Sequence, residues 1–392
     1  MTMAMAAASL VASTRKHVYR FSKSSLAVRQ LRGIHRPKVS WLDLRGTGLS
    51  AIERLAIEEL LLRHDPWRRC WAIIGVHEPT ENRILNNINL PAYYAPTAHQ
   101  NSDEDTFGHV YEERNTSCAI IMGIGGKAER LIDIVSARKD GVLIIKRFSG
   151  GGTVVVDHSS LWTTFIGRNY ILPHVAPFPR EIMQWSADTI FGPAFDRWNE
   201  AIQPQPVHNN MEKESNKRQT LIVHGKSCGL CGGDNESIAI PSTDISASLR
   251  QSRTTSTLPT FRLKENDYIL DSLHGERKIG GNAQAIVSGG FLHHTSFLWD
   301  WDNNNMKYLK LPDKRPTYRG DRSHDDFLVR LKDHYGKYST KNSLFDHVKH
   351  AMHDRFHMEE TTLRDVIKIA NEQFGGLQQW FDGKCRTRVV QL

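Results

Sequence analysis

Short apolar runs separated by polar stretches dominate the first three quarters of the chain. Runs of strand length occur at 41–44, 71–76, 118–122, 141–146, 261–271, 284–287 and 291–299. Two further runs, 153–156 and 162–166, flank the polar sequence Asp157-His158-Ser159-Ser160, and this spacing predicts a hairpin. The run at 291–299 is continuous enough to predict a central strand of a sheet.

Helical periodicity appears in four places. Ser50 and Glu53 have the spacing of a capping box, and the apolar residues that follow predict an amphipathic helix of about twelve residues with its acids on the outer face. Residues 127–134 predict a short helix. Residues 180–198 also have helical spacing, but Gly192-Pro193 predicts a kink or two shorter helices. Past residue 323, three helical patterns follow, and the last ends at Gly375-Gly376.

These elements predict an α+β fold, a mixed β-sheet with packed helices. We expect a main domain over residues 39–335 and a helical C-terminal segment over 336–392. Two regions rich in polar residues, at about 77–116 and 203–258, predict insertions that are largely loop or disordered.

Charge is distributed unevenly along the chain. Residues 1–38 contain eight basic residues and no acid, so the formal net charge of +8 belongs to this segment alone. The even balance of the remainder argues against nucleic-acid binding. A basic, Ala/Ser-rich segment without acids is typical of an organellar transit peptide, and we expect a disordered leader directing the chain to the mitochondrial matrix, with the plastid as the alternative. A plain basic tail is the other interpretation.

Membrane spans, disulfides and metal sites are not expected. The sequence has no run of about 18 or more apolar residues, so we expect a protein that is not membrane-bound. Its five cysteines are odd in number and accompany a matrix-type leader, which argues against disulfides. Cys228 and Cys231, with His224 nearby, resemble half of a zinc site, but no second cysteine pair completes it.

Two stretches carry the candidate chemistry. Three consecutive glycines, Gly150 to Gly152, lie between two strand-like runs, where the lack of Cβ atoms lets the backbone approach a ligand. The second stretch, 275–284, contains Lys278 followed by Gly280-Gly281-Asn282-Ala283. A lysine alone is most often a solvated charge, and a triple glycine alone is often a flexible turn.

Together these stretches resemble the signature of lipoate-protein ligases, in the biotin/lipoate ligase superfamily. The glycines stand in an Arg-x-Ser-Gly-Gly-Gly sequence, and Glu265-Asn266-Asp267 and His293 to Leu298 agree in order before and after the lysine. The match runs from about Trp41 to about His324. The resemblance implies a ligase catalytic domain over 39–335, with the active site over one face of a sheet.

The resemblance also implies an activity and its site residues. The family uses ATP and Mg²⁺ to convert lipoate or octanoate to an acyl-adenylate, then transfers the acyl group to a lysine of lipoyl-domain proteins, such as 2-oxoacid dehydrogenase E2 subunits and the glycine-cleavage H protein. We expect a monomer. Lys278 is the predicted catalytic residue, because its ammonium can contact both the carboxylate and the α-phosphate. The predicted substrate-binding residues are Arg147, Ser149, Gly150, Gly151, Gly152, Thr153 and Val154, and the predicted nucleotide-binding residues are Asn266, Asp267, Gly281, Asn282, Ala283 and His294.

Positions that differ from the family's motifs, and residues that other families require but this chain lacks, bear on the alternative functions. The family's Arg-Arg pair is Lys146-Arg147 here, and a frequent histidine of the family is Val156. Biotin is disfavoured because the arginine-rich loop of biotin ligases is missing. A cysteine acyltransferase is disfavoured because 261–277 and 307–322 contain no cysteine. A lipoyltransferase that takes a preactivated or carrier-bound acyl group stays open, as does a non-catalytic acyl- or nucleotide-binding protein. His293 and His294 are neighbours on a predicted strand, so at most one can face the ligand.

Overall fold

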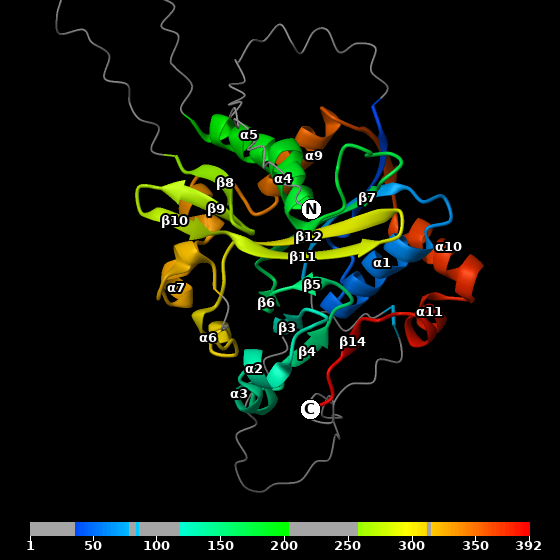
Figure 1. Ribbon diagram of the computed structural model, residues 1–392, viewed down its shortest axis with the longest axis horizontal. Helices are drawn as coiled ribbons and strands as arrows, with labels where there is room; N and C mark the ends of the chain where they lie inside the picture. The colour runs from blue at the N-terminus through cyan, green and yellow to red at the C-terminus, as the bar shows by residue number, and fades with distance from the viewer. Residues whose placement is uncertain (1–35, 78–83, 86–117, 204–257, 312–314) are drawn as a thin grey trace, which may run out of the picture. The chain divides into compact units, whose positions relative to one another are not determined.

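Three β-sheets and the helices between them make up the part of the protein that the computed structural model describes, namely residues 36–77, 84–85, 118–203, 258–311 and 315–392 (Figure 1). The predicted leader and most of both predicted insertions, including Cys228 and Cys231, lie outside the described residues. Pro37–Leu392 forms one compact unit, and the C-terminal segment is part of it.

The largest sheet has seven strands, and the strand predicted from 291–299 lies in its interior, beside the middle strand. The strand order is β13 (His357–Thr361), β1 (Lys38–Asp43), β2 (Cys70–Val76), β7 (Ser160–Arg168), β12 (Gly290–Leu298), β11 (Gly280–Val287) and β5 (Gly150–Gly151). Every residue of β12 is buried, as expected for a strand with neighbours on both sides. The prediction of a central strand is therefore confirmed.

Two smaller sheets complete the strands. One has the order β14 (Arg388–Val389), β4 (Leu143–Lys146), β3 (Cys118–Met122) and β6 (Val154–Asp157), and the other has the order β10 (Gly275–Lys278), β9 (Asp267–Ser272) and β8 (Thr260–Lys264). The predicted hairpin between 153 and 166 is wrong. β6 pairs with β3, whereas β7 pairs with β2 and β12, because the Asp157–Ser160 turn carries the chain from one sheet to another.

Helix α1 (Ala51–His64) begins with the predicted capping box, in which the Ser50 amide donates to the Glu53 carboxylate at 2.9 Å. The prediction that its acids face solvent is wrong. The helix packs against the large sheet on one side and the four-stranded sheet on the other, so Glu53, Glu58 and Glu59 are buried. Their carboxylates accept hydrogen bonds that offset the cost of burial. The Ile84 and Leu85 amides, for example, donate to Glu53.

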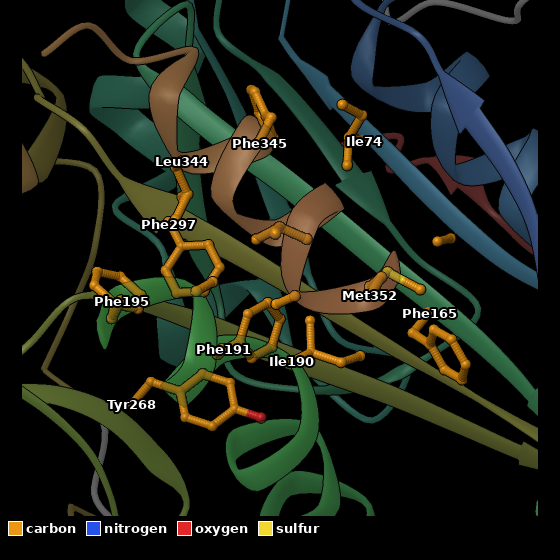
Figure 2. Packing of buried hydrophobic residues seen from close by; sticks show 14 of the residues in the cluster. Ile74, Phe165, Ile190, Phe191, Phe195, Tyr268, Phe297, Leu344, Phe345 and Met352 are labelled. Atoms are coloured by element: carbon orange, nitrogen blue, oxygen red, sulfur yellow. The ribbon is translucent and has the colours of Figure 1, made fainter. Parts of the chain in front are cut away.

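A second group of helices covers the opposite face of the large sheet. It contains α4 (Pro179–Ser186), the π-helical turn η3 (Ala187–Phe191), α5 (Gly192–Ile202) and α9 (Ser343–His353). Figure 2 shows their apolar side chains, among them Phe191, Phe195 and Leu344, packed with Tyr268 and Phe297 from the sheets. The predicted interruption at Gly192-Pro193 is confirmed, because the π turn ends where the proline begins the next helix.

The other described helices are shorter or lie near the C-terminus: α2 (Ala128–Leu131), α3 (Ile134–Lys139), α6 (Asn303–Met306), η5 (Thr317–Arg319), α7 (His324–Phe327), α8 (Leu331–Tyr335), α10 (Leu363–Phe374) and α11 (Leu377–Gly383). Of the three predicted C-terminal helical patterns, the second and third are confirmed as α9 and α10, whereas the first is divided between the short helices α7 and α8. Helix α10 ends at Gly375 with φ of 79°. The predicted C-terminal segment also contains the two strands β13 and β14. Within the described ranges, no helix is long and apolar enough to span a bilayer.

Candidate active site

A cavity of about 860 Å³, here called the main cavity, lies between the glycine segment (Gly150–Gly152) and Lys278. The β8–β9 turn and residues 315–328, here called the basic strap, complete its walls. One part of the lining is apolar, and it includes Leu131, Val155, Leu298, Met306 and Leu309. Another part is charged, and it includes Glu265, Asp267, Lys278, Arg315 and Arg319. The cavity thus combines a surface for a hydrocarbon chain with a surface for charged groups.

The glycine segment is an edge strand as well as a loop. Gly150 and Gly151 form β5 and pair with Gln284 and Ala283 of β11. Gly151 has φ of 120°, and a Cβ atom there would come within 2.4 Å of the Asn282 carbonyl oxygen. A Cβ atom on Gly152 would meet nothing within 4 Å. Glycine is therefore required at Gly151 by the close approach of two strands, whereas Gly152 faces open space.

Arg147 supports this segment from behind. Its guanidinium donates hydrogen bonds to the carbonyl oxygens of Ile121 at 3.3 Å, Gly150 at 3.3 Å and Gly152 at 2.8 Å. The residue is 3% exposed, and burial lowers its pKa to about 10. Arg147 does not line the main cavity, and Ser149 does not either. In the described part of the chain, Arg147 therefore shapes the glycine segment, and its contact with substrate stays a prediction.

Lys278 is the last residue of β10, and its ammonium lines the main cavity. Its Nζ lies 2.6 Å from Oδ1 of Asp267, and the side chain is 23% exposed. The Tyr318 hydroxyl donates to Oδ2 of the same carboxylate at 3.0 Å. Burial, followed by the negative charge of Asp267, raises the pKa of Tyr318, so this hydroxyl stays protonated and remains a donor. Asp267 thus fixes the ammonium beside the glycine segment.

The structure places other predicted residues in two groups. Thr153, Val154, Asn266 and Gly281 line the main cavity together with the glycine segment. Asn282, Ala283 and His294 line a much smaller neighbouring cavity of about 20 Å³, which Arg147 also borders. Nucleotide binding by the latter three stays a prediction. His294 faces α1, where its Nδ1 lies 3.1 Å from Glu58, and Ala283 is its partner on β11. The Asn282 side chain faces the other side of the sheet, where its Nδ2 donates to the Asn266 carbonyl at 3.5 Å and its Oδ1 accepts from Thr295.

His294 and His293 face opposite sides of β12, as predicted. His294 Nδ1 lies 3.1 Å from the buried Glu58 carboxylate and 2.8 Å from the Thr164 hydroxyl. His293 Nε2 lies 2.9 Å from the Tyr268 hydroxyl in the other core, and burial lowers the pKa of His293 to about 3. Neither ring lines the main cavity, so both histidines belong to the supports of the sheet.

Sequence reasoning missed the basic strap and Lys310, which line the cavity opposite the glycine segment. The strap is held in place by Glu265, whose carboxylate accepts the Thr317 and Tyr318 amides at 3.1 and 3.2 Å. It also joins the strand of Lys278, because the Val329 amide donates to the Lys278 carbonyl at 3.0 Å. The only signal in the sequence was a group of basic residues between 307 and 322.

The arrangement of a glycine segment, a fixed lysine and one shared cavity agrees with a family match. Residues 84–179 and 240–357 match the model of the lipoyl protein ligase A/B catalytic domain, which covers more than half of the chain. The chain belongs to this family. The family resemblance found in the two sequence motifs is therefore confirmed, and the α+β fold agrees with it.

Two proteins similar to this lipoyl protein ligase family member are informative. The inactive lipoate–protein ligase 2 of Plasmodium falciparum is 24% identical over 273 residues, which cover 64% of this chain. The chain spans 61% of the length of that relative. Among solved structures, the bi-partite lipoate protein ligase of Thermoplasma acidophilum superposes with a TM-score of 0.51 at 14% identity, covering 89% of this chain and 93% of that one. This last similarity concerns the fold alone.

Two acids, Glu265 and Asp267, are in the lining of the main cavity. They already accept hydrogen bonds from the strap and pair with Lys278. Within the described ranges, no three His, Cys, Asp or Glu side chains are grouped so that they could hold a metal. The expected use of Mg²⁺ stays a prediction.

Proposed function

We propose that the protein is a lipoate-protein ligase. It activates lipoate or octanoate with ATP and transfers the acyl group to a lysine of lipoyl-domain acceptor proteins, such as 2-oxoacid dehydrogenase E2 subunits or the glycine-cleavage H protein. The observation that carries the proposal is the placement of Lys278, held by Asp267, with the glycine segment on one cavity of about 860 Å³. Family membership supports the reaction class.

The first half-reaction joins the carboxylate to the nucleotide. A carboxylate oxygen attacks the α-phosphorus of ATP, a P–O bond forms, and pyrophosphate leaves with the electrons of the broken bond. Both reactants are anions, so a fixed ammonium lowers their repulsion as they approach. Lys278 supplies this charge, and the exposed Gly152 leaves room for reactants beside the backbone. The apolar lining around Leu298 and Met306 suits the hydrocarbon chain.

The second half-reaction forms the amide. The neutral amine of the acceptor lysine attacks the acyl carbonyl, the C–O bond to the phosphate breaks, AMP leaves, and the new amide nitrogen loses a proton. Negative charge grows on the leaving phosphate during this step. Lys278 stays beside that charge and stabilises it. Removal of such a contact from a closed site costs on the order of 10²-fold or more in rate.

The test is incubation of the protein with apo H protein, lipoate and ATP, followed by intact mass of the acceptor. We expect one lipoyl amide per acceptor, release of pyrophosphate, and loss of both in the Lys278→Ala variant. Lys368→Ala is the matched control, because Lys368 is exposed on α10 and pairs with Glu372. No mass increase with ATP or with preformed lipoyl-adenylate would refute the proposal. An increase with lipoyl-adenylate alone would identify a lipoyltransferase.

A second candidate is a non-catalytic acyl- or nucleotide-binding protein. The name of the Plasmodium relative, an inactive ligase, favours it. This candidate predicts that Lys278→Ala leaves the protein's function in cells intact.

We also propose the mitochondrial matrix as the location, on the strength of the eight basic residues and the lack of acids in the first 38 residues. Fluorescence microscopy of the full chain, with and without those residues, tests this.

A further inference from the structure

Arg319 carries a hydrogen-bond donor that no described residue uses. The residue ends η5 in the basic strap, lines the main cavity and is 5% exposed. Its Nη2 atom is buried and has no hydrogen-bond partner within the described part of the chain. A buried donor without a partner costs about 1–3 kcal/mol, and more when the group is charged. An arginine kept under these conditions points to a ligand.

The rest of the Arg319 side chain is held in place. Its Nε donates to the Arg322 carbonyl oxygen at 3.2 Å, and Cζ of the guanidinium lies 4.6 Å from the centre of the Phe327 ring. The guanidinium is therefore fixed in position while Nη2 has no partner among the described residues. A guanidinium presents its donors as a rigid planar fork, which suits the oxygen atoms of a phosphate group.

Cations and acids both surround Arg319. Burial lowers the pKa of Arg319, Arg315 and Arg322 lower it further, and Asp267 raises it. The cavity acids do not neutralise the group directly, since Glu265 accepts the strap amides and Asp267 accepts from Lys278 and Tyr318. A bound anion would supply the missing counter-charge and the missing acceptor together.

We propose that Arg319 is a phosphate-binding residue of the main cavity, donating to a phosphate oxygen of the nucleotide. The proposal rests on the proposed function and assigns two cations to two tasks. Lys278, fixed by Asp267, acts where the carboxylate meets the α-phosphate, and Arg319 holds the phosphate from the strap. The two lie on connected elements, because Tyr318, the residue before Arg319, contacts the same Asp267 carboxylate as Lys278.

Arg322 is the positioning residue for this contact. Its Nε donates to the Arg319 carbonyl at 3.0 Å, Nη2 donates to the Tyr318 carbonyl at 2.5 Å, and Nη1 donates to the Glu276 carbonyl at 2.8 Å. Glu276 belongs to β10, the strand of Lys278. Arg322 therefore ties the strap to that strand, and it acts on the phosphate only through Arg319.

The experiment is calorimetric titration of the full chain with AMP, adenosine and inorganic pyrophosphate. The variants are Arg319→Gln and Arg319→Lys, with Arg262→Gln as the matched control, because Arg262 is exposed on β8 and pairs with Asp271. A hydrogen bond between charged groups contributes about 1.5–3 kcal/mol, so Arg319→Gln should weaken AMP or pyrophosphate binding by roughly 10- to 100-fold. Adenosine affinity should change by less than about twofold, and Arg319→Lys should recover part of the loss.

Thermal unfolding separates a ligand contact from a structural role. Arg319→Gln removes the unused Nη2 donor but also the Nε hydrogen bond to Arg322 and the contact with Phe327, so the unfolding temperature should fall by about 3 °C or less while adenosine binding is kept. Equal weakening of AMP and adenosine, or unchanged AMP and pyrophosphate binding in Arg319→Gln, would overturn the assignment. So would a wild-type chain that binds neither phosphate probe. Phosphate binding that depends on Arg319 in a chain that forms no acyl-adenylate would uphold the assignment and refute the ligase.

Discussion

Gly151 is glycine because two strands approach closely, whereas Gly152 leaves open space beside the backbone. The substitutions Gly151→Ala and Gly152→Ala test these two reasons separately. At Gly151 the backbone has φ of 120°, and the new Cβ would lie 2.4 Å from the Asn282 carbonyl oxygen and 2.7 Å from Arg147 Nη2. Neither neighbour is a free side-chain end, because Asn282 belongs to β11 and Arg147 is bonded to three carbonyls. The β5–β11 pairing must shift to relieve the contact.

The cost follows from these distances. Unfavourable backbone conformations cost about 1–3 kcal/mol, and the clash adds to this, so we expect Gly151→Ala to lose about 3 kcal/mol of unfolding free energy. Unfolding entropy is roughly 2 cal/mol/K per residue, so a unit of this size should lose about 4 °C in Tm. At Gly152, where a Cβ meets nothing within 4 Å, we expect a change below about 0.5 kcal/mol.

Calorimetric Tm and the rate of pyrophosphate release, measured on both variants, form the assay. Gly152→Ala should keep its Tm but raise the KM for the acyl substrate, because its methyl group enters the main cavity. Gly151→Ala should lower Tm and also slow the reaction, because the segment itself moves. Equal Tm values for the two variants would show that the β5–β11 approach does not require glycine.

Three other predictions follow from buried polar groups. Glu59→Ala should cost about 3 kcal/mol and speed hydrogen exchange of residues 385–389, because the buried carboxylate accepts the Arg386 and Thr387 amides; unchanged exchange would contradict this. Burial lowers the pKa of His293 to about 3, so below about pH 6.5 the unfolded chain binds a proton that the folded chain does not. Stability should therefore fall as pH drops from about 6.5 toward 3, by up to about 1.4 kcal/mol per pH unit, and urea titrations of His293→Gln should show a shallower fall. Asp267→Asn should lower kcat about tenfold with little change in acyl KM, since Lys278 loses its fixed partner; a change in KM alone would argue against a positioning role.

The apolar runs predicted the positions of the strands well, but they predicted less well which strands pair with each other. The strand at 118–122 is where the sequence places it, because a continuous apolar run of that length requires burial on both faces. The strand predicted at 291–299 lies one residue earlier, at 290–298. The short runs around Asp157 are equally compatible with a hairpin and with a change of sheet, and tertiary contacts decide between them. β13 contains charged residues and β14 has only two residues, so neither gives a period-2 signal.

The candidate site was also predicted only in part. The two motifs predict that Lys278 and the glycine segment share a cavity, and they do. The direction of Arg147 could not be predicted, because a guanidinium near three backbone carbonyls and one near a substrate have the same sequence signature. Arg319 escaped notice because its neighbours in the strap are placed on the cavity by contacts with Glu265, Asp267 and Glu276, which are distant in sequence from the strap.

The two C-terminal strands, β13 and β14, complete two of the sheets. β13 adds to the large sheet beside β1, and β14 closes the edge of β4 while Glu59 holds the residues before it. During synthesis, β1 leaves the ribosome more than three hundred residues before its partner. The large sheet therefore gains its edge strand β13 only when translation is nearly finished.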